Sequence, residues 1–219
     1  SIVTFARDML AGLFLAGDWT DIVWVDADIQ FHWRDLLKLL AYPVDLVGGS
    51  YRIKMDREAY PIEFVEDPIT SYDPFTGEPS KTGLIPVKYV PMGFCRMKRS
   101  VLERMRDHRK DFEYTAPMFP DNKFWGMFDT GVVDGRCVGE DALFCHRWRE
   151  IGGEVLTDPW LRLVHVGNKS FPGCLGDYLR NRNQPETPEQ ALEKFRQLRD
   201  AFADPHLQHA FKQATGDAA

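Results

Sequence analysis

Two aspartates spaced two positions apart, Asp26 and Asp28, follow a short apolar segment at residues 22–25. That segment reads Ile-Val-Trp-Val, and its β-branched and aromatic residues are typical of a buried strand. Ligands of open α/β sheets bind beyond the carboxyl ends of the strands, which is where both acids would lie. Two carboxylates there favour a hard cation, Mg²⁺ or Mn²⁺, and such a cation would hold a diphosphate. Because an acid after a strand is often only a turn residue or a helix cap, the pair needs support from other positions.

A second pair of acids, Glu140 and Asp141, begins a predicted helix. Acids in the first turn of a helix are favoured by the helix dipole whatever their function. The preceding segment, residues 111–130, is rich in aromatic residues, and Phe124 and Trp125 offer flat apolar faces on which a sugar ring could stack. The alternative for each aromatic residue is a hydrophobic lid that packs on the domain itself. Glu140 and Asp141 thus lie between a segment suited to carbohydrate stacking and the predicted strand that leads to His165, and this context favours a functional role.

His165 is the third candidate, and it lies near the end of a predicted strand at residues 161–166. A histidine in an apolar strand is more often a hydrogen-bonded core residue than a metal ligand. Its place at the strand end, with Gly167 close behind, would allow it to complete a cation site begun by Asp26 and Asp28. We therefore expect these three side chains to converge.

Helices and strands alternate along most of the chain. Helical periodicity and capping signals predict helices at residues 2–15, 33–40, 100–108 and 139–151, and apolar runs predict strands at residues 22–25, 45–51, 87–95, 154–157 and 161–166. Such alternation is typical of an α/β fold with a mostly parallel sheet flanked by helices. Because the first element is a helix, we expect an upstream strand to be absent from this chain.

Composition limits the class of protein. The 219 residues suffice for one sizeable domain with an appendage, and 44% of them are hydrophobic and 27% charged, as in ordinary globular proteins. The formal net charge of −6 disfavours a nucleic-acid partner. No apolar run reaches the length of a membrane span, no secretory signal is evident, and the four cysteines lack metal-ligand spacing. We expect a cytoplasmic protein, with peripheral attachment to a membrane as a second option.

Four motifs together resemble the nucleotide-sugar glycosyltransferases of the A-type fold, closest to the large inverting family 2 and its relatives. They are Val25-Asp26-Ala27-Asp28, Pro91-Met92-Gly93-Phe94 continuing through Arg99-Ser100-Val101-Leu102, Gly139-Glu140-Asp141 with Cys145 and Arg147, and His165-Val166-Gly167. The resemblance covers about residues 1–167 and lies in the order and spacing of the motifs. It implies a Rossmann-like, mostly parallel sheet flanked by helices, with a catalytic domain at residues 1–172 and a helical C-terminal extension at residues 173–219.

The resemblance also implies roles for particular residues. Three positions match ligands of the divalent cation that holds the donor diphosphate: Asp26, Asp28 and His165. Asp141, with Glu140 beside it, matches the acid that deprotonates the acceptor hydroxyl. Arg7 resembles an arginine placed near the nucleotide. Members of this family normally begin with a strand that carries base- and ribose-binding residues, and no such strand precedes the first helix here.

The expected function is therefore that of a metal-dependent enzyme. With Mn²⁺ or Mg²⁺, it would move a sugar from a nucleoside-diphosphate sugar to a hydroxyl acceptor, such as a carbohydrate, with inversion of the anomeric centre. Two alternatives remain open: a nucleotidyltransferase acting on sugar phosphates, and a non-catalytic carbohydrate-binding domain of the same fold. A haloacid-dehalogenase-like phosphatase is disfavoured, because Gln30 stands where that class would have Thr or Val.

Overall fold

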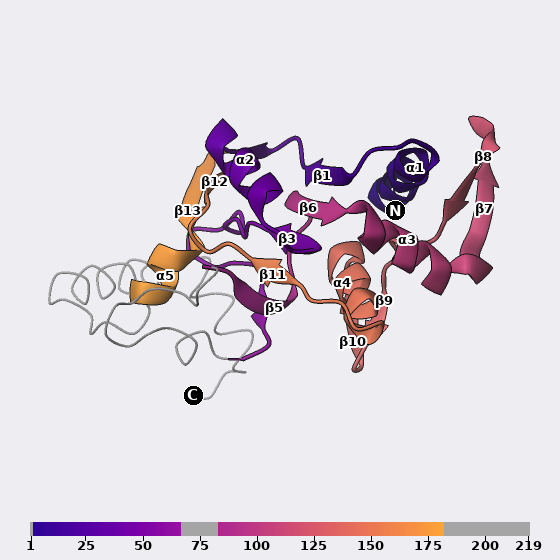
Figure 1. Ribbon diagram of the computed structural model, residues 1–219. Helices are drawn as coiled ribbons and strands as arrows, with labels where there is room; N and C mark the ends of the chain where they lie inside the picture. The colour runs from indigo at the N-terminus through magenta and orange to yellow at the C-terminus, as the bar shows by residue number, and fades with distance from the viewer. Residues whose placement is uncertain (1, 67–82, 182–219) are drawn as a thin grey trace, which may run out of the picture. The chain divides into compact units, whose positions relative to one another are not determined.

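The computed structural model describes residues 2–66 and 83–181 (Figure 1). The chain divides into two compact units, Ser1–Arg180 and Asn181–Ala219. Apart from Asn181, the described residues belong to the first unit.

The first residues of the predicted C-terminal extension, 173–219, lie within that unit. They form the end of strand β13 (Ser170–Cys174) and helix α5 (Leu175–Asn181). The rest of the extension, residues 182–219, lies outside the described residues, so its helical structure stays a prediction.

Six short strands form the main sheet, in the spatial order β1-β6-β3-β11-β5-β4. In that order they are Asp21–Val25, Phe94–Lys98, Leu46–Gly48, Leu156–Thr157, Ile85–Tyr89 and Glu63–Phe64. Four of the five neighbouring pairs are antiparallel, and only β3 and β11 run parallel. Figure 1 shows β1, β6, β3, β11 and β5 following one another in this succession.

The prediction of a mostly parallel, Rossmann-like sheet is wrong. Residues 22–25 suggest a strand buried on both faces, but β1 is the outermost strand of the described sheet and fully buries only Trp24. Its partner β6 runs antiparallel, from the pair Val25–Phe94 to the pair Asp21–Lys98. The physical reason is that an apolar run indicates burial but does not encode the direction of the neighbouring strand.

A buried turn divides the apolar run at residues 87–95, which the sequence predicts as one strand. Strand β5 ends at Tyr89 and β6 begins at Phe94, with residues 90–93 between them. The turn brings the backbone of Gly93 to the end of β1, where its carbonyl oxygen accepts a hydrogen bond from the N–H of Asp26 at 3.0 Å. This contact fixes the backbone on which the first aspartate of the Asp-x-Asp motif is carried.

A second, antiparallel sheet carries His165. Its order is β13-β12-β2, where β12 is Arg162–Val166 and β2 is Ile29–Gln30. The register pairs His165 with Ile29, and the N–H of Val166 donates to the carbonyl oxygen of Asp28 at 2.8 Å. Strand pairing thus brings the histidine beside the end of the Asp-x-Asp motif.

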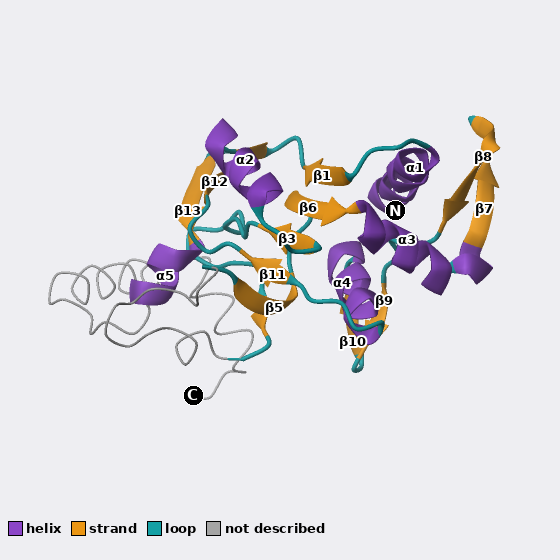
Figure 2. Ribbon diagram, in the orientation of Figure 1, coloured by secondary structure: helices purple, strands orange, loops and turns teal. Residues whose placement is uncertain are grey.

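The helices form where the sequence predicts them (Figure 2). They are α1 (Ile2–Ala16), α2 (Trp33–Ala41), α3 (Arg99–His108) and α4 (Glu140–Glu150), with α5 in addition. Helix α2 begins with a capping box: Nδ1 of His32 accepts a hydrogen bond from the N–H of Arg34, and Oδ2 of Asp35 accepts one from the N–H of His32. Among the described residues, no helix is long and apolar enough to cross a membrane.

The main hydrophobic core joins the sheet to α1, α3 and α4. Aromatic residues lie at its centre: the Phe128 ring stacks on that of Phe144 in α4 at 4.6 Å between centroids and meets Trp24 of β1 edge-on at 5.3 Å. Burying each such side chain contributes roughly 1.5–3 kcal/mol. This packing fixes the N-terminus of α4 relative to the end of β1.

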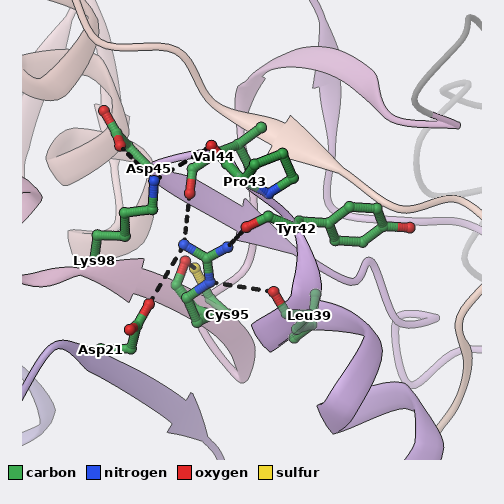
Figure 3. Close-up of polar contacts among 9 residues, drawn as sticks. Asp21, Leu39, Tyr42, Pro43, Val44, Asp45, Cys95 and Lys98 are labelled. Atoms are coloured by element: carbon green, nitrogen blue, oxygen red, sulfur yellow. Dashed lines mark hydrogen bonds and ion pairs between the residues drawn. The ribbon is translucent and has the colours of Figure 1, made fainter.

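A buried arginine holds the segment after α2 against the sheet. The Arg96 side chain in β6 is 0% exposed and donates to the carbonyl oxygens of Leu39, Tyr42 and Val44, while Asp21 lies 3.6 Å away as its ion-pair partner. Figure 3 shows these labelled partners converging on one guanidinium. Because the last turn of a helix leaves carbonyl groups unpaired, Arg96 acts as a side-chain cap for α2.

Candidate functional site

Arg7 joins the ends of three elements that are distant in sequence. It lies in α1 with a side chain only 8% exposed, and its Nη2 is 3.1 Å from Oδ1 of Asp26, directly after β1. Its Nη1 is 3.3 Å from Oε1 of Glu140, the first residue of α4. Nη1 is nevertheless buried without a hydrogen-bond partner in the described part of the chain. The guanidinium therefore retains an N–H group that could donate a hydrogen bond to a ligand oxygen.

Gly93 allows Tyr51 and Asp26 to approach the same point. The Gly93 N–H donates to the Tyr51 hydroxyl at 3.2 Å. A Cβ atom at residue 93 would collide with that hydroxyl and would lie 2.8 Å from Oδ2 of Asp26. The lack of a side chain is therefore required for this approach, rather than any unusual backbone angle.

Asp28 and His165 form a second group on the other side of Tyr51. Oδ2 of Asp28 is 3.4 Å from Nε2 of His165 and 2.6 Å from Nζ of Lys54. The hydrogen bond from Lys54 lowers the pKa of Asp28 below its usual range. Nδ1 of His165 lies 2.9 Å from the carbonyl oxygen of Arg52, and the Tyr51 ring meets the imidazole nearly edge-on at 4.9 Å. These contacts orient Nε2 toward the aspartate.

Asp141 is a largely buried acid in the first turn of α4. Its Oδ1 accepts a hydrogen bond from the N–H of Ala142 at 2.7 Å. Burial raises the pKa of Asp141 above its usual value, and the negative charge of Glu140 adds to this, although the Ala142 hydrogen bond and Arg7 oppose it. A carboxylate with a raised pKa is a stronger base than an ordinary aspartate, as proton abstraction requires.

The Tyr51 hydroxyl connects the two groups electrostatically. Burial raises the pKa of Tyr51 first, and the negative charges of Asp26 and Asp141 raise it further. The Tyr51 hydroxyl and Asp26 thus both lie beside Gly93, and the Tyr51 ring contacts His165. The six polar residues predicted for catalysis, nucleotide and metal lie in two groups, one of Asp28 and His165 and the other of Arg7, Asp26, Glu140 and the adjacent Asp141.

Two residues of this site carry no signal in the sequence. Tyr51 follows an apolar strand and is indistinguishable from a core residue, while Lys54 begins a polar segment without periodicity. The contacts described above assign Lys54 to the Asp-x-Asp motif, and the pKa of Tyr51 responds to the acidic residues around it.

The side chains at this site fit a divalent cation only with ligands from a substrate. Within residues 2–66 and 83–181, no group of three or more His, Cys, Asp or Glu side chains is positioned to hold a metal ion. Asp28 and His165 supply one oxygen and one nitrogen close together, while Asp26 is directed to Arg7. Mg²⁺ sites commonly use one or two carboxylates, with the remaining ligands from water and substrate phosphates. The pair therefore fits a cation whose coordination a diphosphate would complete, once Lys54 turns from Asp28.

The aromatic segment before α4 is a β-hairpin with strands β7 (Glu113–Ala116) and β8 (Phe119–Trp125). Phe124 is 0% exposed, and its ring packs so closely on α1 that a Cβ atom at Gly12 would lie 2.5 Å from it. Phe124 thus has no free ring face for a sugar. Its side chain packs on the domain itself, which is the alternative that the sequence left open. Trp125 is partly buried beside the core, and its acceptor role stays a prediction.

Asp8, next to Arg7 in α1, should make the stability of the protein depend on pH. Its Oδ1 accepts from the N–H groups of Met127 and Phe128, and burial raises the pKa of Asp8 from 3.8 to about 6. The unfolded chain then loses this proton at lower pH than the native state, so stability falls as pH rises from about 4 to about 6. Asp8→Asn keeps an acceptor oxygen but cannot titrate. It should therefore abolish this pH-dependent loss in the free energy of unfolding, which amounts to at most about 3 kcal/mol.

Urea unfolding between pH 4 and pH 7 measures this effect as the stability difference between Asp8→Asn and the wild type. That difference should grow in favour of the variant up to about pH 6 and then level off. The control is Asp107→Asn, which removes an exposed carboxylate paired only with its neighbour Arg106. A difference for Asp8→Asn that is constant across the pH range would contradict the raised pKa.

Comparisons with known proteins give little further information. No protein-family model matches the chain, and no curated protein matches it. One solved structure that matches is described as the crystal structure of A197 from STIV, at 18% sequence identity and a TM-score of 0.43, over 75% of this chain and 68% of that chain. A similarity this weak carries no inference about function.

Proposed function

We propose that this protein is a glycosyltransferase that moves a sugar from a nucleoside-diphosphate sugar to a hydroxyl acceptor with inversion. The observation that carries the proposal is the convergence of two groups around Tyr51. One group is the Asp28–His165 pair, and the other consists of Arg7, Asp26, Glu140 and Asp141. The proposal requires only this arrangement of side chains, and not the parallel sheet that the sequence suggests.

The donor half of the site is suited to a leaving diphosphate. Asp28 and His165 would hold Mn²⁺ or Mg²⁺, which when bound supplies positive charge for the diphosphate as the glycosidic bond breaks. Lys54, which contacts Asp28 in the structure, would provide a second positive charge to the diphosphate after it turns from that carboxylate. Arg7 offers its Nη1, which lies 3.3 Å from Glu140 but makes no hydrogen bond within the described residues, as a donor to a nucleotide oxygen.

Asp141 supplies the acceptor half of the mechanism. The acceptor hydroxyl oxygen forms a bond to the anomeric carbon, the bond from that carbon to the diphosphate oxygen breaks, and the hydroxyl proton passes to the Asp141 carboxylate. Displacement from the face opposite the leaving group inverts the anomeric centre. A base with a raised pKa suits this step, because a hydroxyl is a weak acid.

The same base favours sugar transfer over nucleotidyl transfer. In a nucleotidyltransferase acting on sugar phosphates, the nucleophile is a phosphate oxygen that already carries negative charge. Such a reaction needs no base, whereas a neutral hydroxyl does. The buried carboxylate of Asp141 therefore supports the glycosyltransferase over this alternative.

The test begins with a panel of nucleotide sugars and Mn²⁺, followed by identification of the products. Release of nucleoside diphosphate together with a glycosylated acceptor is expected. Nucleoside monophosphate in the sugar product, with release of pyrophosphate, would identify a nucleotidyltransferase instead. Saturable carbohydrate binding without turnover of any donor would identify a non-catalytic binding domain.

The cation ligands are tested by calorimetry of UDP or GDP in the presence of Mn²⁺. Asp28→Ala and His165→Ala should each weaken nucleotide binding at least about tenfold, because each removes a ligand of the cation. Asp56→Ala is the matched control, since it removes an exposed carboxylate that contacts Lys169. Unchanged affinity in both site variants would refute the cation assignment.

A further inference from the structure

A cavity of about 550 Å³ lies along α4, outside the residues of the donor site. Its walls come from β4, β5, α4 and the hairpin of β9 (Gly131–Val133) and β10 (Arg136–Val138). Figure 1 shows α4 beside β9 and β10, in agreement with the contacts between these elements. The volume is sufficient for a mono- or disaccharide-sized ligand.

Basic side chains dominate this cavity in a chain whose formal net charge is −6. Four of the lining residues carry or can carry positive charge: Lys88, Arg136, His146 and Arg149. Lys88 is paired with Glu63, another lining residue, and His146 contacts Glu150 at 3.4 Å. The two arginines have no side-chain hydrogen bond or ion pair with any residue in the described part of the chain.

The unpaired arginines lie on different walls of the cavity. Arg136 belongs to β10, and Arg149 lies in the last turn of α4. One lining acid, Asp134, also has no ion-pair partner among the described residues, so the unpaired lining charges sum to a positive value. Two guanidinium groups on facing elements are suited to a phosphate or carboxylate, each of which accepts bidentate hydrogen bonds from arginine.

Helix α4 carries both the proposed catalytic base and three of the residues that line the cavity. Ala142, His146 and Arg149 line it at spacings of four and three residues, which place them on one face of α4. Asp141 is adjacent to the first of these, and at 1.5 Å rise per residue it lies about 12 Å along the helix from Arg149. On the opposite wall, burial raises the pKa of Tyr89, and the charges of Glu63 and Asp141 raise it further.

We propose that this cavity binds an acceptor that carries a phosphate or carboxylate group, with Arg136 and Arg149 as the residues that select it. The inference rests on the proposed function, because it places the acceptor hydroxyl at Asp141 and the anionic group toward the arginines. The donor diphosphate binds elsewhere, at Asp28, His165 and Arg7.

Binding of glucose 6-phosphate, glucuronic acid and glucose to the full chain, measured by NMR titration, tests the charge requirement without any need for turnover. Glucose 6-phosphate or glucuronic acid should bind at least about tenfold more tightly than glucose, and comparison of the two anions shows which group the cavity prefers. Arg136→Met and Arg149→Met should each reduce this preference about tenfold. Neither arginine has a hydrogen-bond partner to lose within residues 2–66 and 83–181, so both variants should fold.

The control variant is Arg162→Met, which removes one positive charge from an exposed side chain paired with Asp177, away from the cavity. It should leave the preference for the anionic sugars unchanged. Equal binding of all three sugars would overturn the proposal. So would an anion preference that survives in both Arg136→Met and Arg149→Met.

Addition of UDP with Mn²⁺ separates this proposal from the proposed function. Glucose 6-phosphate should remain bound when UDP is added, because the two occupy different sites; displacement by UDP would show that the arginines hold donor phosphate and would overturn the acceptor assignment. If UDP and Mn²⁺ fail to bind while the arginine-dependent anion preference persists, the donor site is wrong and the anion site stands. If UDP and Mn²⁺ bind but the preference is absent, the acceptor inference alone is wrong.

Discussion

Replacing Asp141 with Asn should lower kcat by about 10²–10⁴-fold while leaving donor binding nearly unchanged. The amide preserves the shape of the side chain and can still accept the 2.7 Å hydrogen bond from the Ala142 N–H, but it cannot take a proton. Because burial raises the pKa of Asp141, the acid limb of the wild-type pH–rate profile should lie above the usual range for aspartate. That limb should disappear in the variant.

Glu150→Gln is the matched control for this prediction. Glu150 ends the same helix and is exposed, with only His146 as its ion-pair partner. Its replacement should leave kcat unchanged. A parallel collapse of UDP and Mn²⁺ binding in Asp141→Asn would reassign Asp141 to the donor site. A product with retained anomeric configuration, resolved by NMR, would refute the inverting mechanism regardless of the kinetics.

Replacing Arg96 with Met should destabilise the fold by about 3–5 kcal/mol. The change fills a similar volume, but it leaves the carbonyl oxygens of Leu39, Tyr42 and Val44 without their donor, the first in a buried and the other two in a part-buried environment. Each unsatisfied buried group costs roughly 1–3 kcal/mol, and Asp21 loses its ion-pair partner as well. Urea unfolding followed by circular dichroism gives the free energy of unfolding.

Two further variants separate the possible causes. Arg96→Lys keeps the charge but cannot reach three carbonyl groups, so most of the destabilisation should persist. Lys98→Met is the matched control on the same strand: its ammonium group contacts Pro43 and Asp45, but the side chain is 38% exposed. That control should cost less than about 1 kcal/mol. A stability of Arg96→Met equal to that of Lys98→Met would contradict the capping role.

The sequence by itself determined where the helices form. Apolar periodicity predicts residues 2–15 and 139–151 as helical, and the structure has Ile2–Ala16 and Glu140–Glu150. These signals are local: a helix forms hydrogen bonds within four residues, and its capping groups lie in the same short segment. The same locality explains why acids and a histidine at the ends of predicted elements could be identified as site candidates.

The sequence nominates candidate residues for the site but gives no information on how they pair with one another. Arg7, Asp26 and Glu140 belong to three elements, and their ion pairs exist because the core packs α1 and α4 against β1. Tyr51 and Lys54 enter the site through contacts with residues far along the chain. Their neighbours in sequence give no indication of those contacts.

Strand direction and side-chain burial depend on contacts between segments that are distant in the sequence. The apolar run before Asp26 is compatible with either direction of its neighbour, and the pairing of β1 with β6 made it antiparallel. Phe124 could equally have faced a ligand or the core until its ring packed on Gly12. Arginine is usually a surface residue, but Arg96 is buried because three carbonyl groups accept hydrogen bonds from its guanidinium. In each case the deciding partner is separated by many residues, so local propensity cannot specify it.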